Sequence, residues 1–316
     1  MTQRVAVTGA SGFIGRHVAA HLAARGTDVV PVRRPFERHT LAEALRGADA
    51  VVHLAGVVSA LGEHDYIAAN VHGTRAVADA ARTAGIPLIH ISSLAAAGPA
   101  SPRAPRTEDD PPAPINAYGR SKLEGERAIA AIDGLHWTML RPGVVYGPGD
   151  RALLPLFWCA ARGFMPLVGR ADAAYTFIHV ADLVRAIAAA VDRPAVGDTL
   201  FVGHPHPVTT LGILEGVRAA SGTRAAIVRI PMALTRLAAL AGDVGGMIRG
   251  RPSVINSRRY VELASEGFVC RVDRLRDRLG VVAQIDLGEG LADACAWYRK
   301  EGWLESRLDA TTSRRG

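Results

Sequence analysis

The first half of the chain alternates short apolar runs with longer stretches of helical spacing. Apolar runs of four or five residues predict buried strands, and apolar residues that recur every three or four positions predict amphipathic helices. Glycines follow several of the helical stretches, as expected where a helix ends. The expected strands are residues 4–8, 28–32, 50–54, 87–91 and 136–140, and the expected helices are residues 13–22, 40–46, 70–84 and 117–132.

The regular alternation predicts a doubly wound α/β fold, in which a parallel sheet carries helices on both faces. A sheet of this kind binds its ligand at the carboxyl ends of its strands. The second half of the chain is less regular. It is expected to contain a helix at 153–162, a strand at 177–180 that enters a helix at 181–191, a strand at 199–202, and further helices with few short strands over 208–308.

The composition narrows the class of protein. Hydrophobic residues make up 49% of the 316 positions, which is enough for a sizeable core and excludes a disordered chain. No apolar run reaches the ~18 residues of a membrane span, and the first residues lack the apolar stretch of a signal peptide. The cysteines at 159, 270 and 295 have neither zinc nor disulfide spacing. We expect a cytoplasmic protein with no membrane span and no metal.

The net charge of +7 raises the question of an acidic partner. Of the 37 basic residues only Lys122 and Lys300 are lysines, which is typical of an arginine-rich genome. The arginines are scattered and aromatic residues make up only 5% of the chain, so we do not expect a nucleic-acid partner. A small ligand that bears phosphate is compatible with this charge.

Three glycines lie between the first expected strand and the helix that follows it. They belong to the sequence TGASGFIG at residues 8–15. Gly9 permits a tight turn, Gly12 lets the backbone approach a phosphate, and Gly15 lets the helix pack closely on the strand. The helix start offers free N–H groups and a positive dipole end to a pyrophosphate. An ordinary glycine-rich turn is the alternative, but the strand–loop–helix context favours dinucleotide binding.

Tyr118 and Lys122 lie four residues apart in an expected helix and therefore share one face. A phenol has a pKa of ~10, and a nearby ammonium lowers that pKa by favouring the phenolate. Such a pair suits general acid–base chemistry at a carbonyl or alcohol, and the ammonium can also hold the ribose hydroxyls of a nucleotide. A solvated pair on the helix surface is the alternative.

Ser92 and Ser93 follow the strand expected at 87–91 and therefore lie at the carboxyl edge of the sheet. Either hydroxyl could stabilise a substrate oxygen. We favour Ser93 as the catalytic residue, with Ser92 as its packed neighbour. A simple turn at the strand end is the alternative for both.

Together these residues resemble the extended short-chain dehydrogenase/reductases, the group of NAD(P)-dependent epimerases and dehydratases and of 3β-hydroxysteroid-dehydrogenase-like enzymes. The matching pieces run along nearly the whole chain. They are TGASGFIG (8–15), VVHLAG (51–56), NVHGT (70–74), ISS (91–93), YGRSK (118–122), RPGVVYGPG (141–149), FIHVAD (177–182) and WYRKEGWL (297–304).

The resemblance implies a catalytic triad of Ser93, Tyr118 and Lys122. It implies that Asn70 shapes a cofactor helix and joins a proton relay, with structural hydrogen bonding as the alternative. It also implies a homodimer formed through two sheet-covering helices, one of which carries Tyr118. The cofactor-binding residues that we expect are Gly9, Ser11, Gly12, Phe13, Ile14, Gly15, Arg33, Arg34, Leu54, Ala55, Gly56, Tyr118, Lys122, Pro142, Gly143, Val144 and Val145.

The resemblance also implies how the chain divides. Residues 1–149 and 176–204 are expected to form a dinucleotide-binding Rossmann domain, and residues 150–175 and 205–308 a smaller substrate-binding lobe. Residues 309–316 are expected to be a frayed tail.

The second expected strand ends in Arg33 and Arg34, where NAD-preferring relatives carry an acid that binds the ribose hydroxyls. An arginine at this point can pair with a 2′-phosphate. We therefore expect NADP as the preferred cofactor and NAD as the alternative. Two solvated arginines in an arginine-rich chain would explain the same residues. The family's adenine-contacting Gly-Asp-Leu has no counterpart over residues 35–41.

Two marks of enzymes that use sugar nucleotides are missing. Residues 143–145 contain no asparagine, and Tyr175 stands where such enzymes often have arginine. We therefore expect hydride transfer between the nicotinamide and a carbonyl or alcohol of a small, weakly charged or apolar substrate. A nucleotide-sugar epimerase or dehydratase with a tightly bound cofactor is the first alternative, and a non-catalytic nucleotide-binding subunit is the second. The segment 232–242 is either an apolar lid or an ordinary packed helix.

Overall fold

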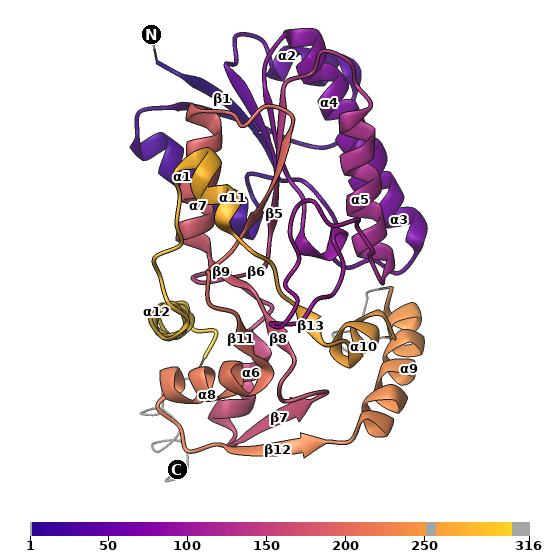
Figure 1. The fold of residues 1–316 in the computed structure, drawn as a ribbon, viewed down its shortest axis with the longest axis vertical. Helices are drawn as coiled ribbons and strands as arrows, with labels where there is room; N and C mark the ends of the chain where they lie inside the picture. Colours follow the sequence, from indigo (N-terminus) through magenta and orange to yellow (C-terminus); the bar gives the residue numbers. More distant parts are fainter. Residues whose placement is uncertain (1, 251–256, 305–316) are drawn as a thin grey trace.

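The computed structural model describes residues 2–250 and 257–304. Figure 1 shows two parts, a sheet flanked by helices in the upper half and a lobe of small sheets and helices in the lower half. None of the helices in these described ranges is both long and apolar enough to cross a membrane. The protein is an α/β protein with a Rossmann-type parallel sheet, as the alternation of apolar runs predicts.

The central sheet has six strands in the order β10-β5-β4-β3-β1-β2, and every pair is parallel. The chain leaves β1 toward β2 and then returns to the other side of β1 to form β3. Parallel sheets bind ligands at such a reversal, outside the carboxyl ends of the strands. The strands are β1 (Arg4–Thr8), β2 (Asp28–Val32), β3 (Ala50–His53), β4 (Leu88–Ile91), β5 (Trp137–Pro142) and β10 (Asp198–Val202).

Each face of the sheet has its own apolar core. Along β4, Ile89 and Ile91 join the core on one face and Leu88 joins the core on the other, because alternate side chains of a strand point to opposite faces. One face is covered by α1 (Phe13–Ala24), α7 (Val180–Asp192) and α11 (Asp273–Leu279), and the other by α2 (Arg38–Ala44), α4 (Gly73–Ala84) and α5 (Ala117–Ala130).

The lobe has a separate core around Phe157, Met165, Val217 and Tyr298. Its helices are α6 (Leu154–Ala161), α8 (Thr210–Ser221), α9 (Met232–Arg249), α10 (Ser257–Ala264) and α12 (Leu287–Lys300). Its sheets join β11 (Val208–Thr209), β8 (Ala174–Tyr175) and β13 (Gly267–Phe268), then β12 (Ala226–Ile230) and β7 (Phe164–Val168), and β6 (Val144–Tyr146) with β9 (Phe177–His179).

Residues 273–283 do not pack where the expected domain division puts them. They were expected in the substrate lobe, but Leu275 and Leu279 of α11 are buried in the core that lies under α7 and β10. These two leucines are four residues apart and form one apolar face, which is buried against the central sheet. The tail expected at 309–316 lies outside the described residues.

The helix expected at 70–84 begins earlier and is interrupted. A short helix α3 (Glu63–Ile67) leads into a π-helical turn, η1 (Ala68–His72), and only then into α4. The side chain of Asn70 bonds to both the N–H and the C=O of Val57, at 2.8 and 3.0 Å. These bonds tie the wide turn to the loop after β3, which the periodicity of apolar residues does not reveal.

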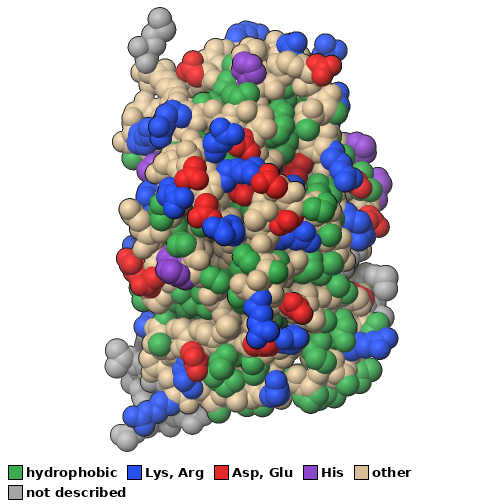
Figure 2. Space-filling model, viewed as in Figure 1, with side chains coloured by type: hydrophobic (Ala, Val, Ile, Leu, Met, Phe, Trp, Pro, Cys, Tyr) green, Lys and Arg blue, Asp and Glu red, His purple; other side chains and the backbone are tan. Residues whose placement is uncertain are grey.

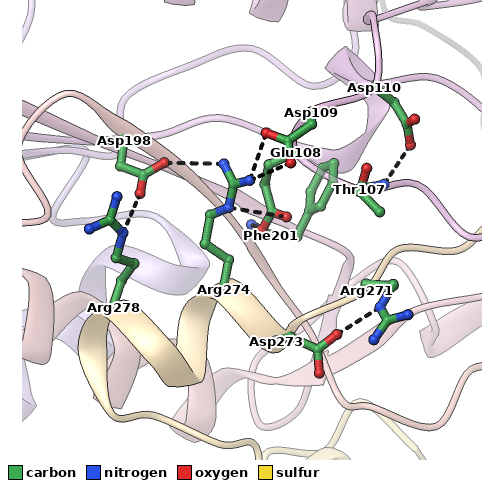
Figure 3. A network of polar contacts seen from close by, with 10 residues as sticks. All are labelled: Thr107, Glu108, Asp109, Asp110, Asp198, Phe201, Arg271, Asp273, Arg274 and Arg278. Atoms are coloured by element: carbon green, nitrogen blue, oxygen red, sulfur yellow. Dashed lines mark hydrogen bonds and ion pairs between the residues drawn. The ribbon is translucent and has the colours of Figure 1, made fainter.

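A cluster of charged side chains anchors the loop of residues 99–114, which is rich in proline and lies between Ser93 and Tyr118 in the sequence (Figure 3). The carboxylate of Glu108 accepts a 2.9 Å hydrogen bond from the N–H of Phe201 on the edge strand β10. Arg274 of α11 joins Asp109 of the loop at 2.7 Å and Asp198 of β10 at 3.5 Å. The loop is therefore held to the sheet and to α11 by both charge and backbone hydrogen bonding.

A buried ion pair joins α5 to the sheet and generates a stability prediction. Glu126 and Arg141 form two hydrogen bonds of 2.9 and 2.6 Å, and both side chains are buried. Glu126→Leu leaves the Arg141 charge unpaired and should cost about 3–5 kcal/mol, whereas Glu126→Leu with Arg141→Met should come close to wild type. Urea unfolding of both variants tests this. Equal losses in the single and double variants would contradict it.

Candidate active site

The glycine loop is shaped by two close backbone approaches. Gly9 has φ +69°, and a Cβ there would lie 2.9 Å from the N atom of Ala55. A Cβ at Gly15 would overlap the carbonyl oxygen of Gly9. Neither position accepts a larger residue. Gly9 lies against the loop after β3, and Gly15, in the first turn of α1, lies against the backbone of Gly9. The loop is therefore fixed against β3 and the first turn of α1.

The start of α1 is open to an anion. Gly12 is its N-cap, no side chain caps the helix, and its first turn carries no acidic residue. Ser11 and Gly12 are exposed, while Phe13 and Ile14 are half-buried. The first N–H groups of a helix have no partner within it, and they point here to the exposed loop. These features fit the pyrophosphate of a dinucleotide.

Two arginines lie beside the glycine loop. In the β1–β2 register Thr8 is opposite Val32, so Arg33 follows alongside Gly9. Arg33 and Arg34 are both exposed, and within the described chain neither has an acidic partner. The guanidinium of Arg34 lies 5.8 Å from the ring centre of Phe36. A cationic rim therefore borders the part of the loop that would hold an adenosine.

The segment after β3 connects the glycine loop to α5. Ala55 donates its N–H to Thr8 Oγ1 at 3.1 Å. A Cβ at Gly56 would lie 3.0 Å from Asn70 Oδ1 and 3.8 Å from Lys122 Nζ. Leu54 packs against the core beneath the sheet. Residues 54–56 thus connect the glycine loop to the surroundings of Lys122.

A buried histidine, His53, lies directly before residues 54–56 at the end of β3. His53 bonds through its two ring nitrogens to Thr8 Oγ1 at 2.7 Å and Thr74 Oγ1 at 3.1 Å. Burial, with the nearby charges of Lys122 and Arg34, lowers the pKa of His53 to about 3. His53 is therefore neutral at physiological pH and acts here as a structural group.

Two glycines let α5 approach its neighbours closely. A Cβ at Gly119 would overlap the carbonyl oxygen of Ala95, and a Cβ at Gly125 would overlap that of Asn70. Asn116 caps the helix by accepting a 2.8 Å hydrogen bond from the N–H of Gly119. The helix α5 thereby packs against η1 and against η2 (Leu94–Ala96), the short 3-10 turn after β4, and from there Lys122 reaches the last carbonyl of β4.

Lys122 is almost completely buried. Its ammonium donates a 2.7 Å hydrogen bond to the carbonyl oxygen of Ile91 at the end of β4. Burial lowers the pKa of Lys122 to about 8, although the carboxylate of Glu126 acts in the opposite direction. The lysine therefore remains mostly charged at pH 7, as holding ribose hydroxyls requires.

The Ser93 side chain lies close enough to the Tyr118 phenol to lower the pKa of that phenol. Burial raises the pKa of Tyr118 to about 12; the Ser93 side chain lowers it, and Glu262 and Tyr66 raise it further. This direction is opposite to the expected lowering by Lys122. The reason is physical: desolvation outweighs the other contributions in the protein alone, and the ammonium of Lys122 is directed at Ile91.

The two serines differ in their surroundings. Ser93 Oγ accepts a 3.2 Å hydrogen bond from the N–H of Ala95 and meets Tyr118. Ser92 is buried, and its hydroxyl has no hydrogen-bond partner among the described residues. Only Ser93 is brought to the tyrosine, which favours it over Ser92.

The remaining expected residues fall into two groups. Asn70 uses its amide for Val57 and for Ser121 Oγ, which it reaches at 2.9 Å, so its contacts brace η1 against α5. Pro142 ends β5, and a Cβ at Gly143 would overlap the carbonyl oxygen of Thr176. Val144 and Val145 continue from there as the half-buried start of β6.

Glu262 is a neighbour of the site that sequence reasoning missed. It lies on α10 in the lobe and accepts a 2.6 Å hydrogen bond from Asn116 Nδ2. Its negative charge raises the pKa of Tyr118. Because 146 positions separate Asn116 from Glu262, no local motif announces the contact. Gly119 and Gly125 were also missed, although two glycines six residues apart in an expected helix are a signal that could have indicated a close approach.

Comparison with known proteins identifies the family. Residues 5–203 match the model of the NAD dependent epimerase/dehydratase family. A ceramide reductase of Caulobacter vibrioides is 30% identical over 97% of this chain and 98% of its own length. A ketoreductase of Stigmatella aurantiaca, which acts on a 4-hydroxy-2-methyl-3-oxo-4-farnesyl-3,4-dihydroquinoline-1-oxide, is 28% identical over 91% of this chain and 94% of its own.

The fold is also similar to that of solved structures. MoeE5 in complex with UDP-glucuronic acid and NAD has a TM-score of 0.75 and 26% identity, covering 94% of this chain and 99% of that one. The glycine loop, the open helix start and the buried Tyr118–Lys122 face agree with a nucleotide-binding enzyme of this kind. This chain belongs to the NAD dependent epimerase/dehydratase family, within the extended short-chain dehydrogenase/reductases, and is an NAD(P)-dependent enzyme.

Proposed function

We propose that this chain is an NADPH-dependent reductase that converts a ketone of a lipophilic substrate to an alcohol. The observation that carries the proposal is the contact of Tyr118 with Ser93 one helical turn from the buried Lys122, beside the open glycine loop. A proton donor and a hydride donor are the two groups that ketone reduction needs.

Each residue has a role that follows from its surroundings. A dihydronicotinamide held by the glycine loop and Lys122 would supply the hydride for the carbonyl carbon. Ser93 donates a hydrogen bond to the carbonyl oxygen, and Tyr118 delivers the proton to that oxygen as it becomes an alcohol. A tyrosine whose pKa is raised by burial holds its proton at neutral pH and therefore suits reduction. Lys122 holds the ribose and places a positive charge beside the phenolate that remains.

The proposed substrate class rests on two observations. Two relatives that match over 97% and 91% of the chain are described as reductases of a ceramide and of a farnesylated quinoline. On the lobe side, Tyr175 stacks on Phe268 with ring centres 6.5 Å apart, where the family's sugar-nucleotide users often place a cation. A tyrosine packed on a phenylalanine offers no positive charge to a diphosphate, which favours a less charged substrate.

A nucleotide-sugar epimerase or dehydratase is the second candidate. The likeness to MoeE5, whose structure holds UDP-glucuronic acid and NAD, favours it. Such an enzyme takes a hydride from its substrate and returns it, so it keeps its cofactor and consumes none. Net consumption of NADPH therefore separates the two candidates.

Replacing the proposed proton donor tests the catalytic role. Tyr118→Phe removes one hydroxyl and should lower kcat for ketone reduction about 10²–10⁴-fold, because general acid catalysis is lost. NADPH affinity, measured by nicotinamide fluorescence, should stay near that of wild type. Tyr66→Phe, on the ring 6.2 Å away, is the matched control and should retain most activity. An unchanged kcat in Tyr118→Phe would contradict the proposal.

Titration with NADPH and NADH tests the cofactor preference. Arg33→Ala and Arg34→Ala each remove a cation beside the glycine loop, and at least one should weaken NADPH binding about tenfold while leaving NADH binding nearly unchanged. Arg46→Ala removes an exposed arginine after α2 and serves as the control for net charge. Equal wild-type affinities for the two cofactors would show that these arginines do not recognise a 2′-phosphate.

A further inference from the structure

Helix α9 exposes large apolar side chains to solvent. Leu234, Leu237 and Leu240 are 57%, 63% and 51% exposed, and their spacing of three places them on one side of the helix. Thr235 and Ala239 are buried on the opposite side, which packs toward α10. The apolar segment 232–242 thus divides into a packed face and an open face, and the open face has no cover in the described chain.

The lobe exposes further large apolar side chains outside α9. Val228 of β12 is 45% exposed and Phe164 of β7 is 42% exposed. Ala226 is paired with Phe164, so Val228, two residues further on, has the same parity and faces the same side of the two strands. Figure 2 shows hydrophobic side chains over the lower part of the molecule, with basic and some acidic side chains between them, where Figure 1 places α9 and β12. Exposed patches of this kind mark interaction surfaces.

The charges near these leucines that lack a polar partner among the described residues are positive. Arg229 of β12 and Arg236 of α9 are exposed and have no acidic partner within the described residues. Asp243 is the only acid of α9, and it accepts a 3.2 Å hydrogen bond from the N–H of Ser257. Leucines beside unpaired arginines are the pattern of helices that lie in the interface of an anionic membrane.

We propose that α9 and β12 dock on the surface of an anionic lipid bilayer, without spanning it. The leucines enter the boundary between headgroups and acyl chains, and Arg236 of the same helix pairs with a lipid phosphate. α9 packs against α10, whose Glu262 bonds to Asn116 at the start of the catalytic helix. Only α10 therefore lies between α9 and the helix that carries Tyr118. The inference rests on the proposed function, because a lipophilic ketone would reach the site from the bilayer.

Vesicle flotation tests the proposal with the full-length protein. Vesicles of phosphatidylcholine with phosphatidylglycerol should carry wild type, and pure phosphatidylcholine should carry much less. Leu234→Ser with Leu237→Ser should lower the partition coefficient about tenfold or more, and Arg236→Gln should lower it only on anionic vesicles. Val196→Ser with Val282→Ser is the matched control, since these valines are 55% and 45% exposed away from the lobe, and it should bind as wild type does. Circular dichroism verifies that all variants fold.

Two outcomes would overturn the docking proposal. One is equal vesicle binding by the leucine variant and the valine control. The other is a wild-type dimer in light scattering that the leucine variant converts to a monomer, which would assign the face to a second copy of the chain. Reduction of a short, water-soluble ketone without vesicles is measured in parallel and should not change in the leucine variant. Flotation without any reductase activity would sink the proposed function and leave the docking surface standing.

Discussion

The site depends on how closely the backbone of α5 approaches its neighbours. Gly119 lies against Ala95 and Gly125 lies against Asn70, so the helix comes nearer to the end of β4 than side chains would allow. Only at this separation does Lys122 reach the carbonyl of Ile91 and Tyr118 meet Ser93. Protein interiors are densely packed, and a methyl group at either glycine would push the whole catalytic face outward.

The same close approach sets the electrostatics. It removes Tyr118 and Lys122 from water, which raises the pKa of the tyrosine to about 12 and lowers that of the lysine to about 8. Each shift favours the neutral form, and the opposing influences are Ser93 on the tyrosine and Glu126 on the lysine. Glu126 is itself held by Arg141, so the ion pair that fastens α5 to β5 also supports the charge of the lysine. Packing and acid–base chemistry are therefore coupled through one helix.

The sequence predicted those parts of the site that are local. Gly9, Gly12 and Gly15 signalled the loop because a tight turn and a helix start need glycine within a few residues. Tyr118 and Lys122 were visible because helical periodicity places them on one face. Their pKa values were not, since burial depends on elements distant in the chain. The π-turn at Asn70, the packing of α11 on the central sheet and the reach of Glu262 to α5 are all tertiary, and no window of the sequence contains both partners.

The central claim is that the enzyme transfers a hydride from its cofactor to a lipophilic ketone and releases the oxidised cofactor. The most direct measurement uses NADPH carrying two deuterium atoms at C4 of the nicotinamide, with a lipophilic ketone as the substrate and mass spectrometry of the product. We predict one deuterium on the new carbinol carbon, with one NADP⁺ formed for each alcohol. A product without deuterium, or turnover of a nucleotide sugar with no net NADPH consumed, would contradict the account and favour a redox-neutral epimerase or dehydratase.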